Sequence, residues 1–236
     1  MENCKLIVWL SGNSGAGKSF TGDYLARYAG FFHVDGDALS RSQVPEERQL
    51  FANLVKAFGS WFEEQSAPRE LWEPYYSFMC DRVREALLEY DKVVISLTVY
   101  HRETRDFIRQ KLPEHLFILL RCSKEELIRR ARVRFSEYAK SRGKSFQEAW
   151  EEQHCEIFSE EKFDTKTLYI MRGLQPIHSD ENLCYEVDVS DGAPWEQLHS
   201  ILNLPLPNTE NIIIEEIAAI NYNRFQDIKD PIETPP

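Results

Sequence analysis

The sequence predicts an α/β protein, in which short buried strands alternate with amphipathic helices. Short apolar runs rich in β-forming residues recur along the chain, and segments with apolar residues at helical spacing separate them. A glycine-rich loop directly follows the first apolar run. The first strand, the helix after that loop and the next strand fall within residues 5–34, which is the arrangement of a βαβ unit.

Five segments have the length and composition of buried strands. Each is a short run of mainly apolar residues of the kind found in parallel sheets, which are covered on both faces. These segments are 5–10, 31–34, 93–97, 116–120 and 185–189.

Helices are predicted between these strands, and residues that start or stop helices support several of them. Gly30 is placed to end the first helix, and Pro45 is tolerated in a first helical turn. Ser123 and Glu126 have the spacing of a capping box. The predicted helices are Lys18–Ala29, Pro45–Phe62, 69–90, Glu103–Lys111, one that opens after Ser123, Trp195–Ile201 and Glu210–Arg224.

Composition excludes several classes of protein. The 236 residues carry a net charge of −11, which argues against non-specific nucleic-acid binding. No apolar run approaches the about 20 residues that span a bilayer. The five cysteines are scattered and form no Cys-x-x-Cys pair, which favours reduced thiols in the cytoplasm. A signal peptide is not expected, because the glycine-rich loop begins at Gly12.

This loop fits the phosphate-binding pattern G-x-x-x-x-G-K-[ST] at every fixed position, and we refer to it as the P-loop. Glycines let successive backbone N–H groups point at phosphate oxygens, and the helix that follows adds its positive end. Lys18 is expected to bridge the β- and γ-phosphates of ATP, and the Ser19 hydroxyl to bind Mg²⁺. No Asn-Lys-x-Asp guanine-binding motif is present, which favours ATP. The predicted nucleotide-binding residues are Gly12, Asn13, Ser14, Gly15, Ala16, Gly17, Lys18, Ser19 and Phe20.

Two carboxylates, Asp35 and Asp37, follow the second predicted strand, which we expect next to the strand that leads into the P-loop. Ligands of open α/β sheets bind at this edge. We expect Asp35 to hold Mg²⁺ and Asp37 to act as the base for an attacking hydroxyl, although the opposite assignment stays open. The alternative is an Asx turn without a chemical role. Arg41, shortly afterwards, is a predicted substrate-binding residue.

Two groups of basic residues complete the predicted site. His101, Arg102 and Arg105 follow the third strand and are expected to clamp an anionic group of the substrate. The alternative is a solvated helix start in which Arg105 pairs with a neighbouring acid.

The helix after the fourth strand carries four arginines, at 129, 130, 132 and 134. Arg130 and Arg134 share one face and are predicted catalytic residues on a lid that closes over the transferred phosphoryl group. The alternative is a solvated face that balances the acids at 148, 151, 152 and 156.

These residues resemble the gluconate kinase group of P-loop kinases and, more distantly, adenylylsulfate kinase and shikimate kinase. The matching pieces are Gly12–Ser19, Asp35-Gly36-Asp37, Ser96–Arg109, 129–134 and Asp188-Val-Ser190. The resemblance implies a P-loop NTPase fold with a five-stranded parallel sheet, an ATP:alcohol phosphotransferase activity and a moving lid.

We therefore expect a kinase that phosphorylates a hydroxyl of a small, anionic metabolite such as a sugar acid, acting as a monomer or homodimer. Residues 1–204 would form the kinase domain, with an acceptor-binding region at 40–90, a lid at 123–162 and a tail at 205–236. One alternative is a nucleoside or nucleotide kinase that stacks a base on aromatic residues, namely Trp61, Phe62, Trp72, Tyr75 and Tyr76. The other is a nucleotide-binding switch protein that phosphorylates nothing.

Overall fold

Five parallel strands form one sheet in the order β2-β3-β1-β4-β5. The computed structural model describes residues 5–207, so the predicted helix Glu210–Arg224 lies outside the described residues. The sheet confirms the predicted α/β class with a five-stranded parallel sheet, the P-loop NTPase fold. The strands are β1 (Leu6–Gly12), β2 (Phe32–Asp35), β3 (Lys92–Ser96), β4 (Leu116–Arg121) and β5 (Cys184–Asp188).

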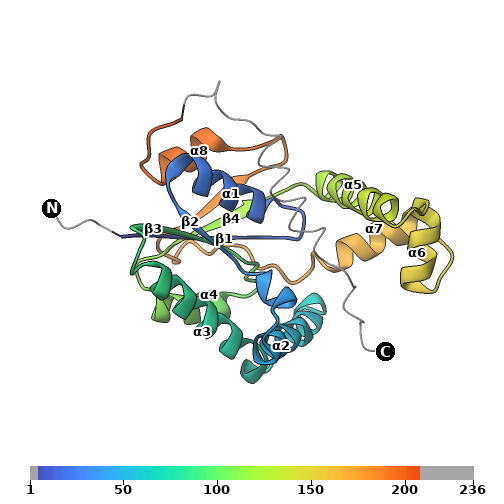
Figure 1. Ribbon diagram of the computed structural model, residues 1–236, viewed down its shortest axis with the longest axis horizontal. Coiled ribbons are helices and arrows are strands. Elements are labelled where there is room, and N and C mark those ends of the chain that lie inside the picture. The colour runs from blue at the N-terminus through green and yellow to red at the C-terminus, as the bar shows by residue number, and fades with distance from the viewer. Residues whose placement is uncertain (1–4, 208–236) are drawn as a thin grey trace.

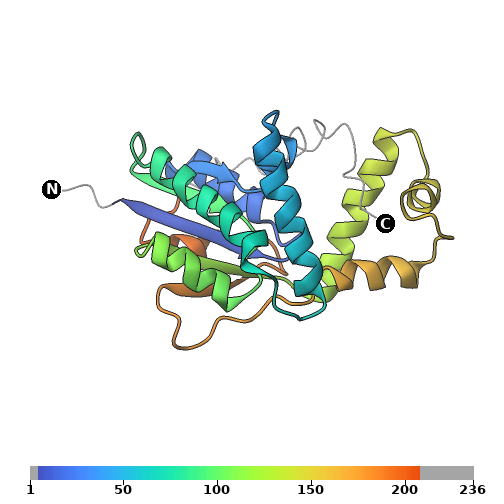
Figure 2. The same ribbon diagram turned by 90° about the horizontal axis from the view of Figure 1, so that it is seen from below.

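Helices cover both faces of this sheet. Helices α1 and α8 lie on one face and α3 and α4 on the other, while α5, α6 and α7 project beyond the carboxyl ends of the strands (Figure 1). Figure 2 shows α2 standing beside this projection. The helices are α1 (Lys18–Ala29), the short 3₁₀ helix η1 (Ala38–Arg41), α2 (Pro45–Phe62), α3 (Arg69–Ala86), α4 (Arg102–Lys111), α5 (Lys124–Ser141), α6 (Phe146–His154), α7 (Glu160–Tyr169) and α8 (Trp195–Ile201). Among residues 5–207, none is both long enough and apolar enough to cross a membrane.

The prediction that the strand before the two aspartates neighbours β1 is wrong. That strand is β2, at the edge of the sheet, and β3 lies between the two. Ser96 of β3 is the register partner of Asp35 on one side and of Leu10 on the other. Burial explains the order, because β3 is almost wholly buried whereas Phe32 of β2 is 38% exposed.

The aromatic residues of α2 and α3 belong to the hydrophobic core. Four of the five proposed for base stacking, Trp61, Trp72, Tyr75 and Tyr76, are at most 1% exposed. The fifth, Phe62, is partly buried against the same core. A base needs an accessible ring face, so the structure gives no support to the nucleoside-kinase alternative.

Helices α5, α6 and α7 span the predicted lid and continue to Tyr169, past its predicted end at residue 162, and we keep the name lid for these three helices. An aromatic cluster separate from the main core holds the three helices together. Its rings belong to Phe135, Phe146, Trp150, Phe158 and Phe163. These three helices therefore have packing of their own.

The predicted capping box at the start of α5 is half formed. The Ser123 hydroxyl accepts a hydrogen bond from the backbone N–H of Glu126, as expected of an N-cap. The Glu126 carboxylate binds two arginines instead of returning to Ser123, whose N–H donates to the hydroxyl of Ser190. A complete capping box, formed by Ser145 and Glu148, opens α6.

Candidate active site

The P-loop joins β1 to α1 in a conformation that glycine makes possible. Gly12 and Gly15 have φ values of 146° and 87°, in the left-handed region. A Cβ on Gly12 would lie 2.5 Å from the carbonyl oxygen of Leu120, so only glycine lets the loop pass β4 so closely. Lys18 Nζ donates to the carbonyl oxygens of Gly12 and Asn13 at 3.1 and 3.2 Å. The ammonium group therefore lies over the loop, as a phosphate-binding lysine should.

The acidic loop, Asp35-Gly36-Asp37, is held in place by three hydrogen bonds. The backbone N–H of Gly36 donates to the carbonyl oxygen of Ser96 at 3.0 Å, and the Tyr75 hydroxyl donates to the carbonyl oxygen of Gly36. Asp35 Oδ1 accepts from the backbone N–H of Asp37 at 3.0 Å, so the Asx turn is present. The turn orients Asp37, whose residue is exposed to solvent at the carboxyl end of the sheet.

Electrostatic interactions couple the acidic loop to the P-loop and the lid. Desolvation lowers the pKa of Lys18 to about 8; Asp37 and Asp35 oppose this shift, and Arg134 adds to it. Partial desolvation raises the pKa of Asp37, although its residue keeps contact with solvent and Lys18, Arg41 and Arg134 act to lower the pKa. Opposite charges from three separate segments thus interact at the carboxyl end of the sheet.

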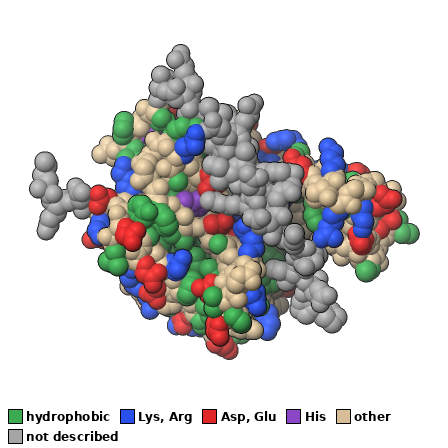
Figure 3. All heavy atoms as spheres, viewed as in Figure 1, with side chains coloured by type: hydrophobic (Ala, Val, Ile, Leu, Met, Phe, Trp, Pro, Cys, Tyr) green, Lys and Arg blue, Asp and Glu red, His purple; other side chains and the backbone are tan. Residues whose placement is uncertain are grey.

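Three of the four lid arginines pair with acids of the lid itself. Arg129 and Arg130 each contact Glu126, at 2.6 and 2.7 Å, and Arg132 contacts Asp164 at 2.5 Å. Figure 3 accordingly shows basic and acidic side chains interspersed on the lid surface. The charges of these three side chains are therefore balanced within the projecting helices, by Glu126 and Asp164 rather than by the acids at 148, 151, 152 and 156 named in the alternative.

Arg130 and Arg134 occupy different places although they share a helix face. Arg130 donates to the carbonyl oxygens of Gly15 and Val189, at 3.2 and 2.6 Å, and so joins the P-loop to the loop after β5. Arg134 interacts with Asp37 and Lys18. Desolvation lowers the pKa of Arg134, and the charge of Asp37 opposes this. Of the two predicted catalytic arginines, Arg134 is therefore the one coupled to the acidic loop.

The structure does not bring the predicted anion clamp together. Arg105 is buried and pairs with Glu181 at 2.7 Å, while Arg102 pairs with Asp180 at 2.7 Å. Both arginines thus bind the segment that leads to β5. Arg105 does pair with an acid, as in the alternative, but the pair is buried and its partner is distant in the sequence, so this part of the helix start is not solvated. The ring of His101 instead contacts Trp61, with centroids 5.5 Å apart, and burial lowers its pKa.

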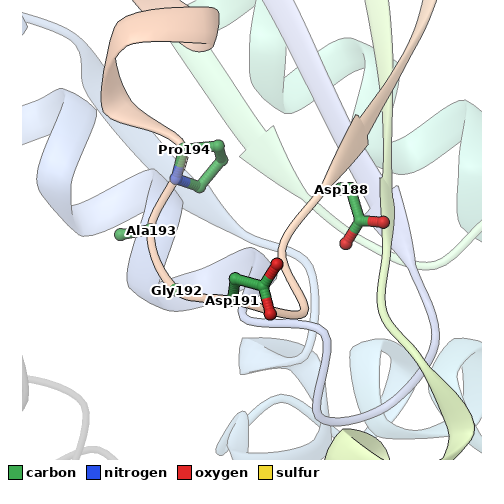
Figure 4. Close-up of a pocket in the computed structure, with 5 residues that line it drawn as sticks. All are labelled: Asp188, Asp191, Gly192, Ala193 and Pro194. Atoms are coloured by element: carbon green, nitrogen blue, oxygen red, sulfur yellow. The ribbon is translucent and has the colours of Figure 1, made fainter.

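A pocket lies along the loop from β5 to α8. Asp188, Asp191, Gly192, Ala193 and Pro194 line it (Figure 4). Arg130 links this loop to the P-loop through Val189. The Phe20 ring stacks on Trp195 of α8, with centroids 5.8 Å apart. Phe20 therefore packs beside this loop.

The site offers oxygen ligands that fit Mg²⁺. Among residues 5–207, no three His, Cys, Asp or Glu side chains cluster to hold a metal by themselves. Mg²⁺ sites in phosphoryl-transfer enzymes need no such cluster, because one or two protein oxygens act together with substrate phosphates and water. Ser19 and Asp35 would supply the protein oxygens. Asp35 Oδ2 also lies 3.5 Å from the guanidinium of Arg41.

Two contributors to the site were not predicted from the sequence. Tyr75 fixes the acidic loop, and the Thr98 hydroxyl donates to the carbonyl oxygen of Gly12 at 2.9 Å. Thr98 follows β3, the strand beside β1, and its position after a buried strand is the one signal that singles it out. Tyr75 carried no such signal, because its spacing is that of an ordinary core residue.

A family comparison completes this description. Residues 8–159 match the family described as AAA domain, which covers more than half of the chain. The chain belongs to the AAA domain family. The matched segment of this AAA domain includes the P-loop, the acidic loop and most of the lid. No curated protein matches the chain in a sequence comparison.

One solved structure supports the same fold for the AAA domain. A sugar kinase from Janibacter sp. HTCC2649 is 17% identical, with a TM-score of 0.50 over 85% of this chain and 95% of that one. A gluconokinase from Sinorhizobium meliloti 1021 is 18% identical, with a TM-score of 0.46 over 96% of this chain and 98% of that one. The predicted resemblance to P-loop small-molecule kinases is confirmed at the level of the fold.

Proposed function

We propose that this AAA domain is an ATP-dependent kinase that transfers the γ-phosphate to a hydroxyl of a small polar acceptor. The observation that carries the proposal is the coupling of Lys18, Asp37 and Arg134 at the carboxyl end of the sheet. A switch protein needs the phosphate cradle alone. A base opposite that cradle and an arginine from a projecting segment are what phosphoryl transfer to an acceptor requires.

In the proposed reaction, Asp37 is the base. The acceptor hydroxyl oxygen forms a bond to the γ-phosphorus, the bond from that phosphorus to the bridging oxygen breaks, and ADP leaves. The hydroxyl proton passes to Asp37, whose raised pKa makes it a stronger base than an ordinary carboxylate. Lys18 and Arg134 stabilise the negative charge on the phosphoryl oxygens. When bound, Mg²⁺ on Ser19 and Asp35 supplies further positive charge.

We propose a sugar acid as the acceptor, with its anionic group near Arg41 and His101. Arg102 and Arg105 are left out of this proposal because Asp180 and Glu181 already bind them. Arg41 also pairs with an acid, Asp35, but at the longer distance of 3.5 Å and with its side chain 25% exposed, so it can meet a ligand at the carboxyl end of the sheet. The choice of a sugar acid rests on the sequence resemblance to the gluconate kinase group.

We propose that the nucleotide base binds in the pocket along the loop from β5 to α8. Arg130 connects this loop to the P-loop, so a nucleotide whose phosphates lie in the P-loop can extend toward it. The carboxylates of Asp188 and Asp191 can accept hydrogen bonds from an exocyclic amino group such as that of adenine.

A screen for ADP release tests the function. The protein is incubated with Mg·ATP and polyols, sugar acids, amino alcohols or nucleosides, and phosphorylated product is identified by mass spectrometry. We expect turnover with sugar acids and none in the Lys18→Ala variant, whose folding is checked by circular dichroism. Lys140→Ala, which removes an exposed lysine from the lid, is the matched control. ATP binding without transfer to any acceptor would instead support the switch alternative.

A further inference from the structure

A buried hydrogen-bond chain joins α1, β2 and β3 close to the acidic loop. His33 of β2 is its centre. The Nδ1 atom of His33 lies 2.8 Å from Asp23 Oδ1 of α1, and its Nε2 atom lies 2.8 Å from Ser96 Oγ of β3. A carboxylate can only accept, so Nδ1 carries a hydrogen in this contact. The chain therefore ties together three elements that approach the site from different parts of the sequence.

The same three residue types form the catalytic triad of serine hydrolases, but here they have no access to a substrate. The side chains of His33 and Asp23 are 3% and 4% exposed, and Ser96 is 1% exposed. A nucleophilic serine has to reach the carbonyl group that it attacks. This hydrogen-bond chain therefore has a structural role.

Helix α1 rests on the imidazole ring through Gly22. A Cβ at Gly22 would lie only 2.3 Å from His33 Nε2, so the contact requires glycine. Gly22 and Asp23 are four residues after Lys18 and Ser19, and residues four apart share a helix face. The face of α1 that carries the phosphate and magnesium ligands is therefore the face seated on His33 one turn later.

Ser96 connects the other end of the chain to the acidic loop. It is the register partner of Asp35, and its carbonyl oxygen accepts the backbone N–H of Gly36 at 3.0 Å. The Ser96 side chain thus binds His33 while its backbone binds the turn between the two aspartates. A shift of α1 relative to β2 would change the separation of Ser19 from Asp35.

We propose that His33, held between Asp23 and Ser96, is a positioning residue that sets the geometry between Ser19 and Asp35, the two proposed protein ligands of Mg²⁺. The role rests on the proposed kinase function. Residues that orient metal ligands without touching the metal typically change metal affinity or activity by about 10–100-fold when they are replaced.

Three substitutions test this role against one matched control. Ser96→Ala removes a single hydroxyl, and Gly22→Ala pushes α1 away from the ring although alanine is the better helix former. His33→Phe keeps a ring but removes both nitrogens. The control is His115→Phe, which changes another buried histidine, one that lies directly before β4 at the amino ends of the strands, away from the site.

For each variant, the Kd of ATP is measured by calorimetry in Mg²⁺ and in EDTA, and kcat is measured with the best acceptor from the screen. We expect the strengthening of ATP binding by Mg²⁺ to fall by about 10–100-fold in the three variants, with kcat falling in parallel. The Kd in EDTA should stay within about twofold of the wild type, because the P-loop is intact. His115→Phe should keep the wild-type magnesium effect.

The role is wrong if Ser96→Ala and Gly22→Ala keep the full magnesium effect, or if they weaken binding equally in EDTA, as general loosening of the fold would. If His33→Phe does not fold, these two variants decide the question. A wild-type protein that shows the magnesium effect but phosphorylates no acceptor contradicts the kinase function and leaves the binding test valid. A wild-type protein without any magnesium effect overturns the positioning role.

Discussion

The guanidinium group of Arg105 and the carboxylate of Glu181 form a buried, two-point ion pair. Arg105 Nε and Nη2 donate to the two carboxylate oxygens, each at 2.7 Å, and the side chains are 2% and 4% exposed. Further hydrogen bonds run from Arg105 to the carbonyl oxygens of Gln175 and Pro176. The pair fastens the segment between the lid and β5 to α4, so it serves the fold of the site and not the acceptor.

Arg105→Ala is therefore expected to destabilise the protein without a specific effect on the acceptor KM. Removing one member of a buried pair leaves the other charge uncompensated, at a cost of about 3–5 kcal/mol. Arg102→Ala is the matched control, because its pair with Asp180 is exposed and exposed ion pairs contribute little to stability. Urea unfolding measures both. Equal losses of stability would contradict the structural role of the buried pair. A large rise in the acceptor KM of folded Arg102→Ala would support the anion clamp.

Arg134→Ala is expected to lower kcat by about 100-fold or more with little change in the Kd of ATP. Its charge lies near Asp37 and Lys18, where negative charge develops on the transferred phosphoryl group, and lost electrostatic stabilisation appears in kcat. Arg132→Ala, on the same helix but paired within the lid, should keep kcat within a few-fold of the wild type. Steady-state kinetics separate the two. Weaker ATP binding at unchanged kcat would show that Arg134 only holds the bound nucleotide.

ATP binding should take up protons near pH 8. The pKa of Lys18 in the free protein is lowered to about 8, mainly by desolvation, so roughly half of the molecules carry a neutral amine at that pH. Bound phosphates favour the charged form and raise the pKa, so affinity should fall as the pH rises above 8. Calorimetry at pH 8 in two buffers of different ionisation enthalpy measures the uptake. An identical binding enthalpy in both buffers would contradict it.

Acid should destabilise the fold through His115. This side chain is fully buried, and desolvation lowers its pKa to about 4 from the ordinary 6.5. The unfolded chain therefore binds the additional proton between these values. The free energy of unfolding is therefore unaffected by protonation of His115 above pH 6.5. It declines as the pH falls toward 4, by on the order of 3 kcal/mol in total.

The comparison that isolates this effect is the stability of the wild type and of His115→Phe at pH 7.5 and pH 5. The variant should lose less stability between the two pH values than the wild type, because phenylalanine has no proton to bind. His178→Gln, at an exposed histidine, should behave as the wild type does. An unchanged pH dependence in His115→Phe would show that the ring is solvated.

Much of the fold could be predicted because local signals decide it. Gly30 adopts the left-handed conformation that ends α1, and α2 begins at Pro45, as the sequence indicates. The P-loop pattern likewise specifies its own backbone, since its glycines and Lys18 lie within a few residues of one another. Such features depend on residues that are close together in the sequence, so they can be predicted from it.

The strand order and the partners of the charges could be decided only in three dimensions. The position of β3 between β1 and β2 depends on how the crossover connections arrange the strands, and that placement brings Ser96 to the acidic loop. The sequence places Arg130 and Arg134 on the same helix face. In the structure, Arg130 joins two loops, whereas Arg134 interacts with Asp37. The sequence by itself determined the phosphate cradle and the residue types around it. Only the tertiary structure decided which charges meet, because a charged side chain pairs with what is near in space and not with what is near along the chain.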